Sequence, residues 1–148
     1  MTARRLIPSL AAALLVATSA AAEPAADTCR ILDVTGGNKV DEVAPLIVAL
    51  ATRWTPENRA RAIETLQALL RDVRFDGGNA YVVARLGEDY EDHVLALRIV
   101  GGELAAARLT YEWTPDGMRL TVLNFQRRIS ALFPVGMPLA AEPIDCGG

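Results

Sequence analysis

Apolar residues recur at helical spacing in the first half of the chain and alternate with polar residues in the second half. The earlier of two helical stretches predicts a helix over about 40–53, in which Pro45 fits only within the first turn. The segment before it, 23–37, contains a short apolar run, Arg30–Val34, that we interpret as a brief strand before Gly36 and Gly37.

A second helix is predicted over about 56–74. Thr55 is a favoured N-cap, Pro56 is favoured at the first helical position, and Glu57 complements the positive end of the helix dipole. The apolar residues of this stretch lie on one side of the predicted helix: Ile63, Leu66, Leu70 and Val73. Such an amphipathic helix needs a partner surface to pack against.

Four runs with strand-forming character follow the helices, and we expect them to supply that surface. Turn residues separate the runs, including Gly101-Gly102, a two-residue hairpin signal, and Pro115-Asp116-Gly117. The strands are expected within 80–127, as Ala80–Leu86, His93–Val100, Leu104–Trp113 and Met118–Arg127. The sequence therefore predicts an α+β fold, with two N-terminal helices packed on a curved four-stranded antiparallel meander and a C-terminal tail over 128–148.

The turn at Pro115-Asp116 predicts the register of the last hairpin, with Trp113 opposite Met118, Tyr111 opposite Leu120 and Leu109 opposite Val122. On the reverse face this register pairs Glu112 with Arg119 and Thr110 with Thr121, both favourable cross-strand pairs.

The Gly101-Gly102 turn predicts Val94 opposite Leu109 and Ala96 opposite Ala107. The face toward the helices would then carry the following residues: Val94, Ala96, Leu109, Tyr111, Trp113, Leu120 and Val122.

The other predicted face is also unusually apolar, since it carries Leu95, Leu97, Leu123 and Phe125. A solvated sheet face normally alternates into polar residues. Three interpretations remain open, and one of them is that the predicted strand register is wrong. Either the segments 29–37 and 128–148 cover this face, or it is the contact surface of a homodimer or of a periplasmic protein partner.

Residues 1–22 have the organisation of a secretory signal peptide. Arg4 and Arg5 form a positive region, an apolar stretch runs over 6–16, and Ala20-x-Ala22 is a small-residue cleavage pattern. The apolar stretch is too short to span a bilayer, so we expect no stable membrane insertion. Residues 23–148 are then expected to form a single domain of a periplasmic or secreted protein.

Charge excludes one class of partner. The chain carries a formal net charge of −3 at pH 7, and removal of Arg4 and Arg5 would make it more acidic. Nucleic-acid binding normally requires clustered positive charge, so we predict no nucleic-acid partner.

The two cysteines, Cys29 and Cys146, lie near opposite ends of the chain that remains after the predicted cleavage. Two cysteines in an oxidising compartment usually pair, and no C-x-x-C motif suggests redox catalysis. We therefore predict one structural disulfide that ties the two ends together.

Candidate catalytic residues are few. His93 is the only histidine, and at the start of a strand it is expected to be solvated. Four carboxylates within 88–92 lack the ligand spacing of a calcium-binding loop and are expected at a solvated hairpin tip. No nucleophile-elbow, zinc-protease or paired-cysteine metal motif occurs, so we predict no catalytic residue, cofactor or metal. The residues kept as candidates for a pocket or contact are Tyr111, Trp113, His93, Leu97 and Phe125.

The helix start Thr55-Pro56-Glu57 and the strand segments 93–97, 102–105, 111–113 and 120–125 resemble the nuclear-transport-factor-2-like superfamily. This superfamily is also called ketosteroid-isomerase-like or cystatin-like, and the likeness is greatest to its small exported members of unknown function. The resemblance covers about residues 38–127 and is one of topology. It implies a ligand pocket between the helices and the concave sheet, and dimerisation through the sheet.

Enzymes of that superfamily need a carboxylate or histidine facing the pocket. Apart from the Tyr111 hydroxyl, the positions that we expect to face the helices are apolar. We therefore predict a non-catalytic module that binds a small ligand or a protein. The alternative is a small isomerase or dehydratase that uses Tyr111 as a hydrogen-bond donor.

Overall fold

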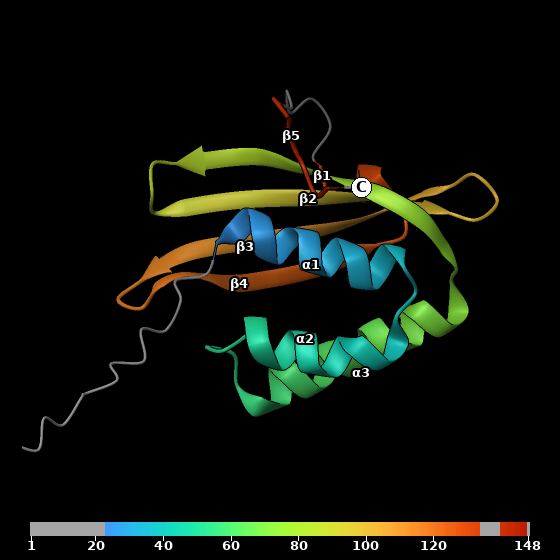
Figure 1. The fold of residues 1–148 in the computed structure, drawn as a ribbon, viewed down its shortest axis with the longest axis horizontal. Coiled ribbons are helices and arrows are strands. Elements are labelled where there is room, and N and C mark those ends of the chain that lie inside the picture. Colours follow the sequence, from blue (N-terminus) through green and yellow to red (C-terminus); the bar gives the residue numbers. More distant parts are fainter. Residues whose placement is uncertain (1–22, 134–139, 148) are drawn as a thin grey trace, which may run out of the picture.

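A computed structural model describes residues 23–133 and 140–147. Figure 1 shows three α-helices followed by an antiparallel sheet. The helices are α1 (Pro24–Gly36), α2 (Val43–Leu50) and α3 (Pro56–Asp72), and the short 3₁₀ turns are η1 (Val40–Glu42) and η2 (Ile129–Ala131). The strands are β1 (Phe75–Leu86), β2 (Tyr90–Ile99), β3 (Leu104–Thr114), β4 (Gly117–Gln126) and β5 (Glu142–Ile144). The predicted signal peptide, 1–22, lies outside the described residues.

The α+β class is confirmed, but the sheet has five strands, in the order β4-β3-β2-β1-β5. The fifth strand, β5, comes from the tail and pairs with β1, with Ala80 opposite Ile144. In Figure 1, α1 lies across the sheet, while α2 and α3 lie beside its β4 edge. The predicted four-stranded meander is therefore correct for β1–β4 and incomplete at the β1 edge.

Helix α1 is the clearest correction to the sequence prediction, because the expected strand Arg30–Val34 lies within it. Pro24 occupies the first helical position, where the missing N–H costs nothing. The buried residues of α1 recur at helical spacing, since Thr28, Ile31 and Val34–Thr35 all face inward. The short apolar run within Arg30–Val34 concealed this longer period.

The two other helices agree more closely with the prediction. Thr55 caps α3, because its Oγ1 accepts a hydrogen bond from the Asn58 backbone N–H at 3.2 Å. Leu66 and Leu70 are the buried residues of α3, as the apolar stripe predicted. Helix α2 is shorter than expected and ends at Leu50, with Pro45 in its first turn.

The hairpin of β3 and β4 begins in the predicted register, with Trp113 opposite Met118 and Tyr111 opposite Leu120. A bulge then places Thr110 opposite Val122, and Leu109 pairs with Leu123 instead of Val122. An extra residue on one strand turns every later side chain to the other face. For this reason Leu123 and Phe125 pack with the helices, while Val122 is 44% exposed.

The predicted register of β2 and β3 is wrong by one residue. His93 lies opposite Leu109, and Leu95 lies opposite Ala107. The turn contains three residues, 100–102, and the Ile99 N–H donates to the Glu103 carbonyl at 2.8 Å. Both turn glycines have positive φ, which a larger side chain would rarely adopt.

This single-residue shift places His93, Leu95 and Leu97 in the core beneath the helices. The face that we considered as a partner surface is thus largely the helix-facing side of the sheet. On the opposite face, Val94 and Ala106 form a smaller cluster with Leu132, to which Ile129 and Phe133 add partial cover. Part of the tail therefore covers the outer face.

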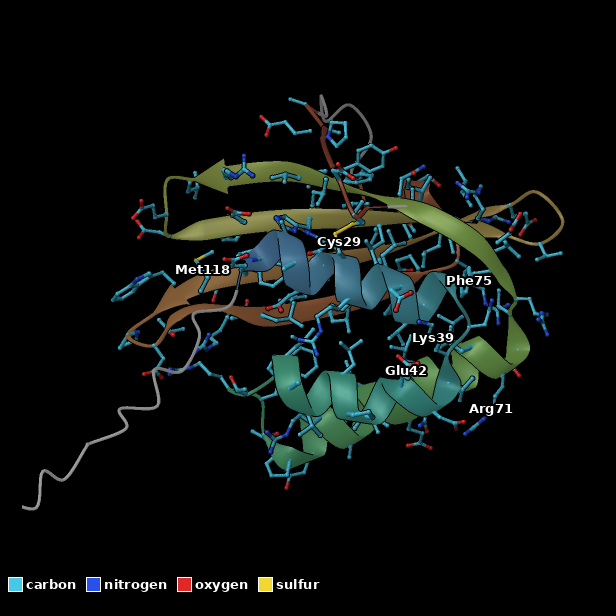
Figure 2. The ribbon with its side chains drawn as sticks, in the orientation of Figure 1. Cys29, Lys39, Glu42, Arg71, Phe75 and Met118 are labelled. Atoms are coloured by element: carbon cyan, nitrogen blue, oxygen red, sulfur yellow. A yellow bond between two sulfur atoms is a disulfide. The ribbon has the colours of Figure 1, made fainter. Side chains whose placement is uncertain are left out.

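The predicted disulfide between Cys29 and Cys146 is present, and it spans 117 positions of sequence with a Cα–Cα distance of 5.3 Å. Figure 2 shows this bond beside α1. It links α1 to the residues that follow β5.

Candidate functional site

A chain of buried polar side chains links α1 to the sheet, with Thr28 at its centre. Thr28 Oγ1 lies 2.7 Å from His93 Nδ1 and 2.9 Å from Tyr111 Oη. On the other side of the imidazole, His93 Nε2 lies 2.8 Å from Glu91 Oε2. Thr28, His93 and Tyr111 are fully buried.

One arrangement of protons satisfies all these groups. His93 Nε2–H donates to the Glu91 carboxylate, which leaves Nδ1 as an acceptor for the Thr28 hydroxyl. Thr28 Oγ1 then accepts from the Tyr111 hydroxyl. This arrangement requires a neutral imidazole and a neutral phenol.

The pKa directions agree with that assignment. Burial lowers the pKa of His93, although its hydrogen bond to Glu91 opposes the shift. Burial raises the pKa of the Tyr111 phenol, although the hydrogen bond to Thr28 opposes this shift. Each buried ring is therefore held in its uncharged form.

The polar chain continues to the sheet edge through Arg85. Its Nε donates to Glu91 Oε1 at 3.2 Å, and its Nη1 donates to Glu142 Oε2 at 2.9 Å. Glu142 belongs to β5. This chain of polar side chains thus connects α1, β1, β2, β3 and β5.

This polar chain resembles a catalytic triad in composition but differs in access. Its hydroxyls and imidazole already bond to one another, and they have no exposed surface at which a substrate would arrive. Among the residues that the structure describes, no buried side-chain nitrogen or oxygen lacks a hydrogen-bond partner. We interpret the cluster as a structural network.

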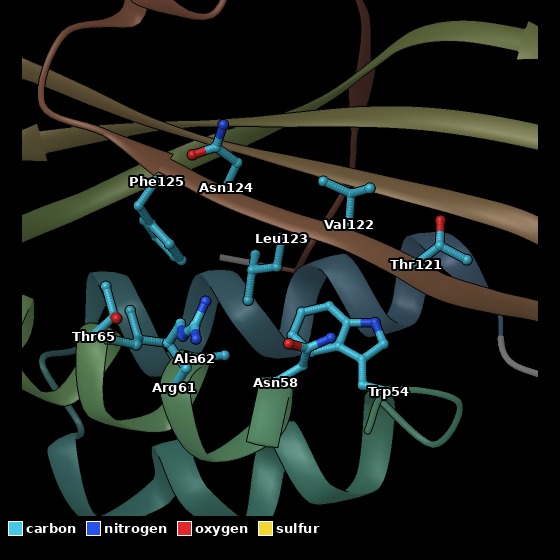
Figure 3. Close-up of a pocket in the computed structure, with 11 residues that line it drawn as sticks. Trp54, Asn58, Arg61, Ala62, Thr65, Thr121, Val122, Leu123, Asn124 and Phe125 are labelled. Atoms are coloured by element: carbon cyan, nitrogen blue, oxygen red, sulfur yellow. The ribbon is translucent and has the colours of Figure 1, made fainter. Parts of the chain in front are cut away.

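The surface feature with the chemistry of a binding site lies elsewhere, between α3 and β4. We name it the α3–β4 groove; its cavity volume is about 400 Å³. Figure 3 shows Leu123 and Phe125 pointing toward α3, whereas Val122 and Asn124 point to the other side of the strand. The lining comprises Trp54, Asn58, Arg61, Ala62, Thr65, Leu66 and the β4 segment 121–125.

Two residues give the groove its character. The Trp54 indole N–H donates to the Leu120 carbonyl at 3.1 Å, which fixes the ring at one end. Among the described residues of the lining, Arg61 is the only one with an ionisable side chain, and Figure 3 shows its guanidinium rising from α3 toward β4. Arg61 forms no ion pair with any residue in 23–133 or 140–147.

The five candidate residues from the sequence do not form one site. His93 and Tyr111 belong to the buried polar chain, Leu97 lies in the core, and Trp113 is 58% exposed. Only Phe125 lines the α3–β4 groove. Arg61 was missed because an arginine on the polar face of an amphipathic helix has the ordinary pattern of a solvated residue.

The acidic segment 88–92 is only partly solvated. Glu91 bonds to His93, and Asp92, which is buried, forms an ion pair with Arg108. The hydrogen bond between Arg108 and Asp92 raises the pKa of Arg108. In the described part of the chain, no group of three or more histidine, cysteine or acidic residues is arranged to hold a metal ion.

Within that same part of the chain, no helix is long and apolar enough to cross a membrane. Comparisons of the chain with protein families, with curated proteins and with solved structures found no match.

Proposed function

We propose that this is an exported, non-catalytic binding protein whose α3–β4 groove takes an amphipathic molecule with a negatively charged group. The observation that carries the proposal is the lining of the groove. Apolar surface from Leu66, Leu123 and Phe125 faces one cation, Arg61, and none of the lining residues that the structure describes carries a carboxylate. Ligand sites typically combine an apolar wall with a few placed polar groups.

Export to the periplasm or the exterior forms part of the proposal. The Cys29–Cys146 disulfide supports it, because such bonds persist in oxidising compartments. The signal-peptide pattern of residues 1–22 supports it independently. The resemblance to the nuclear-transport-factor-2-like superfamily also remains a proposal, and the packing of helices against an antiparallel sheet is compatible with it.

An isomerase or dehydratase is the weaker alternative. That reading needs Tyr111 to donate a hydrogen bond to a substrate, with a carboxylate nearby as base. The Tyr111 hydroxyl is buried and bonds to Thr28 instead. The geometry around Tyr111 therefore favours the binding function.

The proposal is tested with laurate, a fatty acid that combines an apolar chain with a carboxylate. Binding is measured by displacement of the fluorescent dye 8-anilinonaphthalene-1-sulfonate and by thermal shift, since a ligand that binds only the folded state raises Tm. We expect Arg61→Gln to weaken laurate binding about five- to tenfold, which corresponds to about 1 kcal/mol. The matched control is Arg71→Gln, on an exposed residue of the same helix that lies outside the groove and is labelled in Figure 2.

If Arg61→Gln and wild type bind laurate with equal affinity, Arg61 does not bind the carboxylate of the ligand. Absence of saturable laurate binding, together with an unchanged thermal shift, would reject the groove as a site for amphipathic anions.

A further inference from the structure

Strand β4 is an edge strand, because the sheet order ends with it. The opposite edge, β1, is partly paired by β5. An unpaired edge exposes a row of backbone N–H and C=O groups, and native proteins usually cover or disrupt such a row. None of the five β4 residues that line the α3–β4 groove is fully buried.

The register shows which β4 backbone groups face outward. The bond from the Ile99 N–H to the Glu103 carbonyl sets the alternation in β2 and β3. By that alternation, Leu109 and Ala107 direct their backbone groups toward β2. Their partners in β4, Leu123 and Phe125, must direct theirs away from β3, toward the free edge.

A contact on the other side of the bulge agrees with this orientation once the extra residue, Thr121, is counted. The Leu120 carbonyl is accepting a hydrogen bond from the Trp54 indole, so it points away from β3. Trp54 thus covers the edge at Leu120, and the edge at Leu123 and Phe125 opens into the α3–β4 groove.

We infer that the occupant of the α3–β4 groove is a short extended peptide that adds to the β4 edge and ends in a carboxylate bound by Arg61. The inference rests on the proposed function and names its ligand class. Backbone groups of Leu123 and Phe125 pair with the peptide, and alternate peptide side chains pack against Phe125 and Ala62. Strand addition of this kind obtains affinity from main-chain hydrogen bonds.

Charge favours a peptide carboxylate over a second copy of this chain. Pairing of two β4 edges around a two-fold axis places the same cationic groove on both partners, and the described lining of each groove contains no carboxylate. A peptide carboxylate supplies the missing negative charge.

The probe is a pool of fluorescein-labelled hexapeptides in which valine, leucine or phenylalanine alternates with serine or threonine, each with a free C-terminus. We expect saturable binding by fluorescence anisotropy. Amide hydrogen exchange, read by NMR, should slow at Leu123 and Phe125 and remain unchanged at Asn124, which already faces β3.

Two changes to the peptide test the geometry without any risk to folding. Only every second N–H group of a bound peptide strand points toward β4. N-methylation of those residues should weaken peptide binding at least about tenfold. N-methylation of the intervening residues should leave the affinity nearly unchanged. Amidation of the C-terminus should weaken binding to wild type about fivefold and leave binding to Arg61→Gln unchanged.

Four results would overturn the inference. Laurate binding without peptide binding would leave a small-molecule site and preserve the proposed function. If amide exchange at Leu123 and Phe125 slows with rising protein concentration and does not respond to peptide, the β4 edge pairs with a second copy of this chain. Equal effects of the two N-methylated sets would rule out strand pairing. Failure of both laurate and the peptides would reject the proposed function as well.

Discussion

The Thr28 hydroxyl lies 2.7 Å from the His93 imidazole, although 65 positions separate the two residues in sequence. This contact joins α1 to β2 inside the core. Thr28 also bonds to Tyr111, so one side chain satisfies two buried polar groups. Both buried rings depend on the Thr28 oxygen.

Replacement of the Thr28 hydroxyl by a methyl group should lower the free energy of unfolding. Thr28→Val keeps the shape but leaves His93 Nδ1 and the Tyr111 hydroxyl without their partner, and each unsatisfied buried group costs about 1–3 kcal/mol. We expect a loss of about 2–4 kcal/mol in the free energy of unfolding, measured by urea denaturation. The control Thr52→Val, at an exposed position, should change stability by less than about 0.5 kcal/mol. A Thr28→Val variant as stable as wild type would show that the hydrogen bonds contribute little.

Acidification should destabilise the protein through His93. Its pKa in the folded state is below the ordinary value of 6.5 because of burial. As the pH falls below about 6.5, the unfolded chain therefore takes up a proton before the folded one does, and stability decreases with a slope of at most about 1.4 kcal/mol per pH unit.

Asp27 contributes with the opposite sign, since burial raises its pKa and favours the folded state at acidic pH. The measurement is therefore a difference: urea denaturation of wild type and of His93→Gln from pH 7.5 to 5. The wild type should lose more stability over this range than the variant does. Parallel curves would show that His93 does not titrate differently in the folded and unfolded states.

Removal of the disulfide should lower stability substantially. In the chain-entropy model, a loop of 117 residues is worth about 4–5 kcal/mol. The double variant Cys29→Ala, Cys146→Ala should accordingly melt many degrees below wild type in a calorimetric scan. A control titration of denatured, unreduced wild type should find no free thiol. Two free thiols would contradict the bond.

The register of β2 is tested by a pair of leucines. Leu97 is fully buried against the helices, whereas Leu104 is 45% exposed. Leu97→Glu places an unpaired charge in the core, which costs several kcal/mol, and should prevent folding. Leu104→Glu should retain a native far-UV circular dichroism spectrum. A folded Leu97→Glu variant would mean that β2 presents its other face to the helices.

Local signals were sufficient for much of the fold. The cap at Thr55 and the apolar stripe that includes Leu66 and Leu70 identified α3, and the Pro115-Asp116 turn gave the first pairs of the β3–β4 hairpin. These features depend on residues close together in sequence. The cysteine pair was predictable for a different reason, because a chain with only two cysteines can form only one internal disulfide.

The errors arose where one residue decides the outcome. A three-residue turn at 100–102 and a bulge beside Thr110 each reversed the face of a strand, and neither has a distinctive sequence pattern. The polar chain was missed for a related reason. His93 became a core residue only through the corrected register, and its partner Thr28 lies in α1, where the sequence predicted no helix. The groove depends on how α3 lies against β4, which no local signal encodes.

The Cys29–Cys146 bond also closes the polypeptide into a covalent ring that contains every strand from β1 to β5. A protease that cuts once within this ring, for example at the exposed Gly87–Asp89 tip, opens the ring without releasing either piece. The nicked molecule keeps all its atoms and gains one water, and its two halves remain available to each other for reassembly. Damage of that kind is invisible on a non-reducing gel and appears only after a thiol reductant is added.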